Sequence, residues 1–214
     1  MGTELDLLAR YPKAKRDISS RAEKTSEDIE VARRFGRDFF DGDRRYGYGG
    51  YGYSPTRWTG VVEDMIEHYA PIESLLDVGC AKAYMIEEFA NQLADLRVYG
   101  IDISEYAIKN GIMKPCISVG DARDLSRFED KFFDLVVSIN TVHNLARHGC
   151  IHALEEIERV GKEAYITVDA YRNDKEKKRM LDWNLTALTI LHVDEWVELF
   201  KEAGYSGDYG FWCP

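Results

Sequence analysis

Hydrophobic residues along the chain form two kinds of pattern that follow one another in turn. Continuous apolar runs, too short for helices, predict strands near residues 75–78, 97–101, 117–119, 132–139 and 164–169. Between them, apolar residues recur at helical spacing near residues 61–69, 85–93, 105–110, 150–160 and 194–204. Strands that alternate with helices predict an α/β fold with a mostly parallel, doubly wound sheet and helices on both of its faces.

The ends of the predicted sheet are less regular. Only residues 208–213 remain after the last predicted helix, which is too few for a hairpin of two strands. Residues 188–192 are a candidate edge strand. We therefore expect a sheet of six or seven strands.

The first 41 residues predict a helical extension. Ile29, Ala32, Phe35 and Phe39 recur at roughly helical spacing, and Ser26 is a candidate N-terminal cap. The sequence predicts one amphipathic helix that ends near residue 41. It either covers one side of the core or closes over an active site.

Residues 41–60 are rich in glycine, tyrosine and arginine. Tyrosine and arginine supply stacking faces and hydrogen-bond donors, and glycine loosens the backbone between them. One interpretation is an ordered lid or substrate loop; the others are a mobile connection or an RNA-binding segment. As a lid, the segment and its flanks would contact a substrate through Arg45, Tyr46, Tyr48 and Trp58.

The overall charge and the cysteines narrow the class of protein. A net charge of −10 argues against broad contact with a nucleic-acid backbone. The four cysteines are scattered without zinc-ligand spacing, so we expect reduced thiols, no metal and a cytoplasmic location. The N-terminus does not resemble a signal peptide, and no apolar run is long enough to span a membrane.

The first candidate binding residues follow the end of the first predicted strand. Gly79 stops that strand and small residues follow it, which brings bare backbone amides close to a ligand. Asp102 comes 23 residues later at the end of the next strand, where a carboxylate can accept hydrogen bonds from both ribose hydroxyls of an adenosine. Ile103 is placed to pack on the adenine. The pattern predicts a nucleoside-binding sheet.

These landmarks resemble the class I S-adenosylmethionine (SAM)-dependent methyltransferases. Asp77 and Gly79 match the acidic residue and first glycine of the family's motif, and Ala81 and Ala83 stand at its other two glycine positions. Alanine permits the same close approach wherever its φ is negative. Residues 132–139 resemble the family's Phe-Asp-hydrophobic strand.

The resemblance covers about residues 60–212 and implies a transferase. Its cofactor would be SAM, with S-adenosylhomocysteine as the product. By the family pattern, Asp121 accepts from the adenine amino group and the amide of Ala122 reaches a ring nitrogen. We divide the chain into an N-terminal extension with its lid, residues 1–59, and a SAM-binding domain, residues 60–214. An NAD-dependent reductase is the alternative, but Tyr84 stands where that motif needs a small residue.

The segment after the fourth strand would meet the sulfonium end of SAM. Asn140 is placed to bind the methionine part, and Asn144 to contact the acceptor. His143 is the candidate general base, since its ordinary pKa near 6.5 suits proton removal at neutral pH. The alternative for His143 is a structural role. His148 and His152 lie four residues apart, but a third metal ligand is not evident.

The acceptor is predicted only as a class. Aromatic and arginine side chains around a small acidic domain favour methylation of an oxygen or nitrogen of a small polar metabolite, such as a sugar or nucleotide-sugar. Further candidates for the acceptor pocket are Asp169, Tyr171, Arg172, Trp183, Asn184 and Thr186. Protein or RNA methylation and a non-catalytic SAM-binding protein are the alternatives. The sequence leaves the oligomeric state open, with a homodimer as one option.

Overall fold

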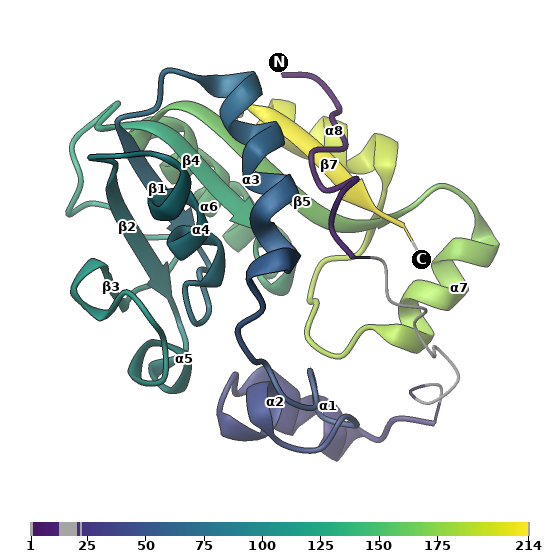
Figure 1. Cartoon of the computed structure of the whole chain (residues 1–214). Helices are drawn as coiled ribbons and strands as arrows, with labels where there is room; N and C mark the ends of the chain where they lie inside the picture. The colour runs from purple at the N-terminus through teal and green to yellow at the C-terminus, as the bar shows by residue number, and fades with distance from the viewer. Residues whose placement is uncertain (1, 13–20, 22, 214) are drawn as a thin grey trace.

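The computed structural model describes residues 2–12, 21 and 23–213, and this part of the chain forms a seven-stranded, all-parallel sheet. The strand order is β3-β2-β1-β4-β5, and β7 lies beside β5 (Figure 1). The short β6 also pairs with β5. The strands are β1 (Ser74–Val78), β2 (Arg97–Asp102), β3 (Ile117–Val119), β4 (Phe133–Ile139), β5 (Gly161–Tyr171), β6 (Leu191–His192) and β7 (Asp208–Trp212).

Helices cover both faces of the sheet, as the sequence predicts. One face packs on α3 (Pro55–Tyr69) and α4 (Tyr84–Gln92) through residues such as Leu75. The opposite face packs on α6 (Arg147–Val160) and α8 (Val193–Glu202) through residues such as Leu76. Successive strand side chains point to opposite faces, and all five residues of β1 are buried. The remaining helical segments are α1 (Ser26–Arg33), α2 (Arg37–Asp41), α5 (Glu105–Lys109), η2 (Lys114–Cys116), η3 (Val142–Asn144) and α7 (Asp174–Trp183).

The single helix predicted up to residue 41 is wrong, because the chain breaks between α1 and α2. Phe35 has a φ of 47° and Gly36 is extended, so the helical path cannot continue through them. The predicted cap is also displaced by one residue. Thr25, not Ser26, caps α1, and Asp28 completes a reciprocal capping box with it.

The end of the sheet is built from two separated single strands. The candidate edge strand forms β6 over its last two residues, and β7 lies parallel to β5. The N-terminal residues then pair with β7: Leu5 donates its N–H to Tyr209, 2.8 Å away. The boundary predicted at residue 60 falls inside α3, so the extension and the sheet share an element.

Residues 23–53, which we call the cap, lie beyond the carboxyl ends of the strands. Figure 1 shows α1 and α2 across the region between α5 and α7. In open α/β sheets this edge is where ligands bind. None of the helices in the described ranges is long and apolar enough to cross a membrane.

Candidate active site

The loop between β1 and α4 approaches the end of β4 very closely. Gly79 has a φ of 89°, and a Cβ built there would overlap Thr141 Oγ1 and lie 2.7 Å from its Cβ. Only glycine satisfies both the backbone conformation and the space. This contact joins the ends of the two strands between which the sheet reverses its order, at the topological switch point.

The two alanines of this loop correct one expectation. Ala81 has a φ of 48° and Ala83 a φ of 65°, so both adopt the left-handed conformation that glycine favours. The expectation of negative φ at these alanines is therefore wrong. The loop follows the backbone path of a glycine-rich turn. The left-handed conformation strains the backbone at the two alanines, because each has a Cβ.

Ala81→Gly should stabilise the protein. Glycine removes the left-handed strain, while the half-exposed Ala81 methyl contributes little packing, so we expect about 1 kcal/mol more free energy of unfolding. Urea unfolding of the two proteins measures the difference. A loss of stability would contradict the assignment of strain to Ala81.

Asp102 is held in place at the end of β2. Its two carboxylate oxygens accept the N–H groups of Ala81 and Ser104, each at 2.8 Å. The side chain is buried, and burial raises its pKa against the effect of these two bonds. A carboxylate oxygen has further acceptor capacity. The group therefore fits the ribose hydroxyls of an adenosine.

Asp77 lies beside Asp102 in the same buried region. Burial, followed by the charge of Asp102, raises the pKa of Asp77 to about 8. A carboxyl group in this environment ionises easily only when a cation approaches it. The ammonium group of SAM has the required charge, so the donor set fits this cofactor.

The predicted adenine contacts differ in their surroundings. Ile103 is 56% exposed, which leaves its side chain free to cover a ring. Asp121 is bound by Arg123, whose Nε donates to Oδ1 at 2.9 Å, and this hydrogen bond lowers the pKa of Asp121. Ala122 packs on the core behind it. An adenine amino group at Asp121 would share the carboxylate with Arg123.

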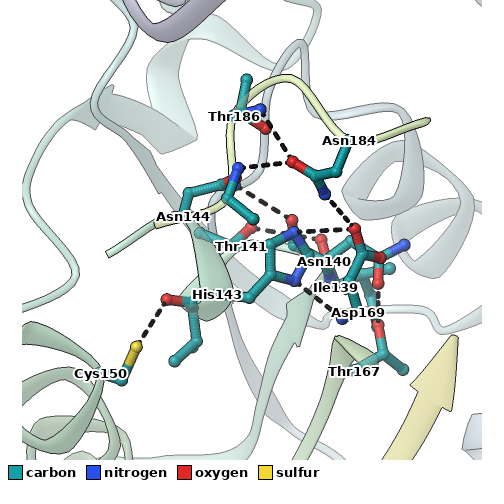
Figure 2. Close-up of polar contacts among 12 residues, drawn as sticks. Ile139, Asn140, Thr141, His143, Asn144, Cys150, Thr167, Asp169, Asn184 and Thr186 are labelled. Atoms are coloured by element: carbon teal, nitrogen blue, oxygen red, sulfur yellow. Dashed lines mark hydrogen bonds and ion pairs between the residues drawn. The ribbon is translucent and has the colours of Figure 1, made fainter. Parts of the chain in front are cut away.

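Asn140 follows β4 in a left-handed conformation, with a φ of 53°. Its N–H donates to Thr167 on β5 and its Oδ1 accepts from the hydroxyl of Thr167 at 3.1 Å. Asn144 donates to the carbonyl of Asn140 at 3.4 Å (Figure 2). Polar groups thus follow β4 at the edge where the cofactor would end.

His143 is buried, with both ring nitrogens directed at Asp169 (Figure 2). Nδ1 accepts the backbone N–H of Asp169 at 3.0 Å, so the proton of the neutral ring is on Nε2, 3.5 Å from Asp169 Oδ2. Burial lowers the pKa of His143 against the opposing charge of Asp169. Both ring nitrogens therefore face Asp169, which favours the structural alternative for His143 over the role of general base.

Several side chains predicted to bind the acceptor belong to the cap's internal packing. Arg45 pairs with the buried carboxylate of Asp28 at 2.8 Å and lies over the ring of Tyr46. Tyr48 packs against Phe39 and Phe40. The tyrosine-rich segment is therefore ordered through its own aromatic core.

The other predicted acceptor residues also have structural contacts. Trp58 is buried in the core between α3 and α4, and Tyr171 packs on His192. Arg172 pairs with Glu4 at 2.7 Å. Trp183 lies under Arg21, 4.2 Å from ring centre to guanidinium, and under Arg44 at 5.5 Å, and the contact with Arg44 joins α7 to the cap. The structure does not bring these residues together at one site.

Two polar residues of this edge, Lys82 and Asp41, were not predicted as site residues, and they form an ion pair. A lysine inside the small-residue loop was the available signal for this pair. Asp169 and Asn184, which the sequence analysis places at the acceptor pocket, form a second pair. Over the described ranges, no cluster of three or more histidine, cysteine, aspartate or glutamate side chains could hold a metal ion.

Comparisons with known proteins agree with this geometry. The Methyltransf_11 family model, described as a methyltransferase domain, matches residues 76–166, from β1 into β5. A SAM-dependent methyltransferase from Archaeoglobus fulgidus superposes with a TM-score of 0.56 at 18% identity, covering 71% of this chain and 69% of its own. No curated protein matches the sequence.

A second similar structure is the plantazolicin methyltransferase BpumL in complex with a desmethyl plantazolicin analogue and S-adenosylhomocysteine. It has a TM-score of 0.56 at 22% identity over 82% of this chain and 76% of its own. These likenesses show the fold, and the family model distinguishes a methyltransferase from the NAD-dependent alternative. Together, the family model over residues 76–166 and the shared fold support a class I SAM-dependent methyltransferase.

Proposed function

We propose that the protein transfers the methyl group of SAM to a hydroxyl or amine of a small polar acceptor. The observation that carries this proposal is the buried Asp169 carboxylate at the end of β5. Its Oδ2 accepts from Asn184 Nδ2 at 2.5 Å and faces His143 Nε2. These two contacts leave the carboxylate with acceptor capacity for another donor.

An acceptor with an O–H or N–H group satisfies this carboxylate. A hydroxyl would give up its proton to Asp169, and an amine would be oriented by it as positive charge develops on nitrogen. A carboxylate acceptor would be repelled. We therefore propose that Asp169 contacts the acceptor and that His143 positions Asp169.

The cap supports a small acceptor. It is tied to α7 and the loop after it, where Lys24 donates to the Asp182 carbonyl at 2.9 Å and Arg33 to the Ala187 carbonyl at 3.1 Å. A folded protein or an RNA helix would have to displace these contacts. The nearby amides and hydroxyls, including Asn144 and Thr186, favour a polar molecule, and a sugar or nucleotide-sugar hydroxyl is the narrower proposal (Figure 2).

On the cofactor side, SAM when bound supplies an electrophilic methyl group, and the chain holds it in line with the acceptor. We propose that its contacts are those predicted from the sequence: Asp77, Gly79, Ala81, Asp102, Ile103, Asp121, Ala122 and Asn140.

Methyl-deuterated SAM tests the acceptor class. The protein is incubated with separate pools of small alcohols and amines, small carboxylates, and cellular protein and RNA, and label is followed by mass spectrometry. We expect label only in the first pool. Label in the carboxylates, protein or RNA would contradict the proposal, and absence of label from every pool would favour a non-catalytic role.

Asp169→Asn should lower kcat/KM about 100-fold and leave the SAM Kd within about twofold, because the change removes the charge that receives the acceptor's donor. Steady-state kinetics and calorimetry measure the two effects. Asp130→Asn, on an exposed side chain, is the matched control. Equal loss of SAM affinity and turnover would assign Asp169 to the cofactor instead.

A further inference from the structure

Lys82 connects the cofactor loop to the cap. It lies between Ala81 and Ala83 and is only 6% exposed. Its Nζ contacts Asp41 Oδ1 at 2.9 Å and Oδ2 at 2.7 Å, and donates to the Tyr51 carbonyl at 2.9 Å. All three donor positions of the ammonium are therefore used by two cap residues.

Two tyrosines of the α/β domain extend this connection. Tyr106 donates its hydroxyl to Asp41 Oδ2 at 2.7 Å, and Tyr84 donates to the Tyr51 carbonyl at 2.9 Å. Tyr51 also donates its N–H to Asp41 at 3.0 Å and stacks on Tyr84. Burial alone would raise the pKa of Asp41, but the bonds from Lys82, Tyr106 and Tyr51 lower it to about 2. Asp41 is therefore ionised at any physiological pH.

A second contact ties the cap to the other adenosine-binding loop. Ser104, two residues after Asp102, donates its hydroxyl to the carbonyl of Phe35 at the break between α1 and α2. The cap therefore contacts both loops that carry candidate cofactor residues, the loop after β1 and the loop after β2. With the contacts from Lys24 and Arg33 on the far side, it is fixed across the whole ligand edge.

We propose that Lys82 is a positioning residue that couples the cap to the cofactor loop, so that SAM and S-adenosylhomocysteine exchange only when the Lys82–Asp41 pair opens. The proposal goes beyond the acceptor chemistry and rests only on the cofactor. Opening the pair exposes a buried ammonium group and breaks three hydrogen bonds at once. Cofactor release is therefore slower than it would be if only the contacts of the cofactor site itself had to break.

Stopped-flow measurement of S-adenosylhomocysteine binding tests the proposal without any acceptor. Lys82→Met should raise the dissociation rate at least tenfold and raise the association rate as well, so that Kd changes less than either rate. Asp41→Asn should do the same. The double variant should resemble each single one, because all three lose the same pair.

Controls separate this role from simple support of the fold. Lys109→Met changes an exposed lysine on α5 and should leave both rates unchanged. Tyr106→Phe removes one bond to Asp41 and should raise the dissociation rate two- to threefold with the melting temperature nearly unchanged. This milder variant keeps the test decisive if Lys82→Met folds poorly.

Unchanged exchange rates in folded Asp41→Asn and Tyr106→Phe would overturn the proposal. A weaker Kd caused only by slower association would do the same, since a coupled cap requires faster release. A wild-type protein that fails to bind S-adenosylhomocysteine would overturn the cofactor assignment itself. Failure to find an acceptor bears on Asp169 alone and leaves these rates interpretable.

Discussion

Gly79→Ala should abolish measurable SAM binding and lower the free energy of unfolding by about 3 kcal/mol or more. The strain of a left-handed alanine accounts for about 1–2 kcal/mol, and forcing a methyl group into a filled space costs about 1–3 kcal/mol more. Thr141 has a short, branched side chain on the 3₁₀ turn after β4, so it cannot move away cheaply. The expected displacement separates the ends of β1 and β4, between which the cofactor loop is held.

Two other glycines make this experiment specific. Gly204 also has a positive φ, 65°, but a Cβ there meets nothing within 4 Å, so Gly204→Ala isolates the conformational cost at about 1 kcal/mol. Gly52→Ala has neither constraint and should be neutral. Urea unfolding gives the stabilities and calorimetry the SAM Kd. Wild-type affinity in Gly79→Ala would show that the loop does not bind the cofactor.

The strands of the sheet were predictable because the residues that specify each strand are adjacent in the sequence. β1 is buried on both faces and therefore appears as a continuous apolar run, and Ser104 caps α5 as its side chain predicts. The break between α1 and α2 was not predictable in this way. Phe35 keeps the helical spacing, and its left-handed backbone is accompanied by a hydrogen bond from Ser104, far away in the sequence.

The positions of the candidate cofactor residues in the fold were similarly predictable from the sequence, and the contacts of the candidate acceptor residues were not. The spacing from Gly79 identifies Asp102, because the lengths of the strand and its connection determine which residue ends the next strand. Asp169 and Asn184 meet only through the path of α7, and Asp41 reaches Lys82 across 41 residues. Aromatic and arginine composition pointed to the acceptor, but Arg45 and Trp58 use those side chains for packing and pairing within the protein.

The buried acids Asp77 and Asp102 of the candidate cofactor site lower the stability of the protein without cofactor. Neighbouring carboxylates in a region of low dielectric repel one another, and burial disfavours their ionised forms. A cationic ligand reverses both effects when it binds. The protein without cofactor should therefore be less stable than its core would permit, and binding should release a proton from Asp77.

Asp77→Asn should make the cofactor-free protein more stable at pH 8 while weakening SAM binding at least tenfold. The pKa of Asp77 is raised to about 8 in the folded protein from the ordinary 3.8, so the folded state binds one proton more between these values. Wild-type stability should fall as pH rises from about 4 to about 8. The variant lacks this loss, and the difference at pH 8 should be on the order of 5 kcal/mol.

Thermal unfolding at pH 5 and pH 8, with and without SAM, measures these opposed effects. Stability of the wild type should decrease between the two pH values, whereas Asp77→Asn should change little, with Asp130→Asn following the wild type. SAM affinity of the wild type should increase from pH 6 towards pH 8 as Asp77 ionises, and this increase should be absent in Asp77→Asn. A variant that is less stable at pH 8, or that binds SAM normally, would show that Asp77 is a structural acid and that the ammonium group of SAM is held elsewhere. The two outcomes are separable because stability is measured without the ligand and affinity with it.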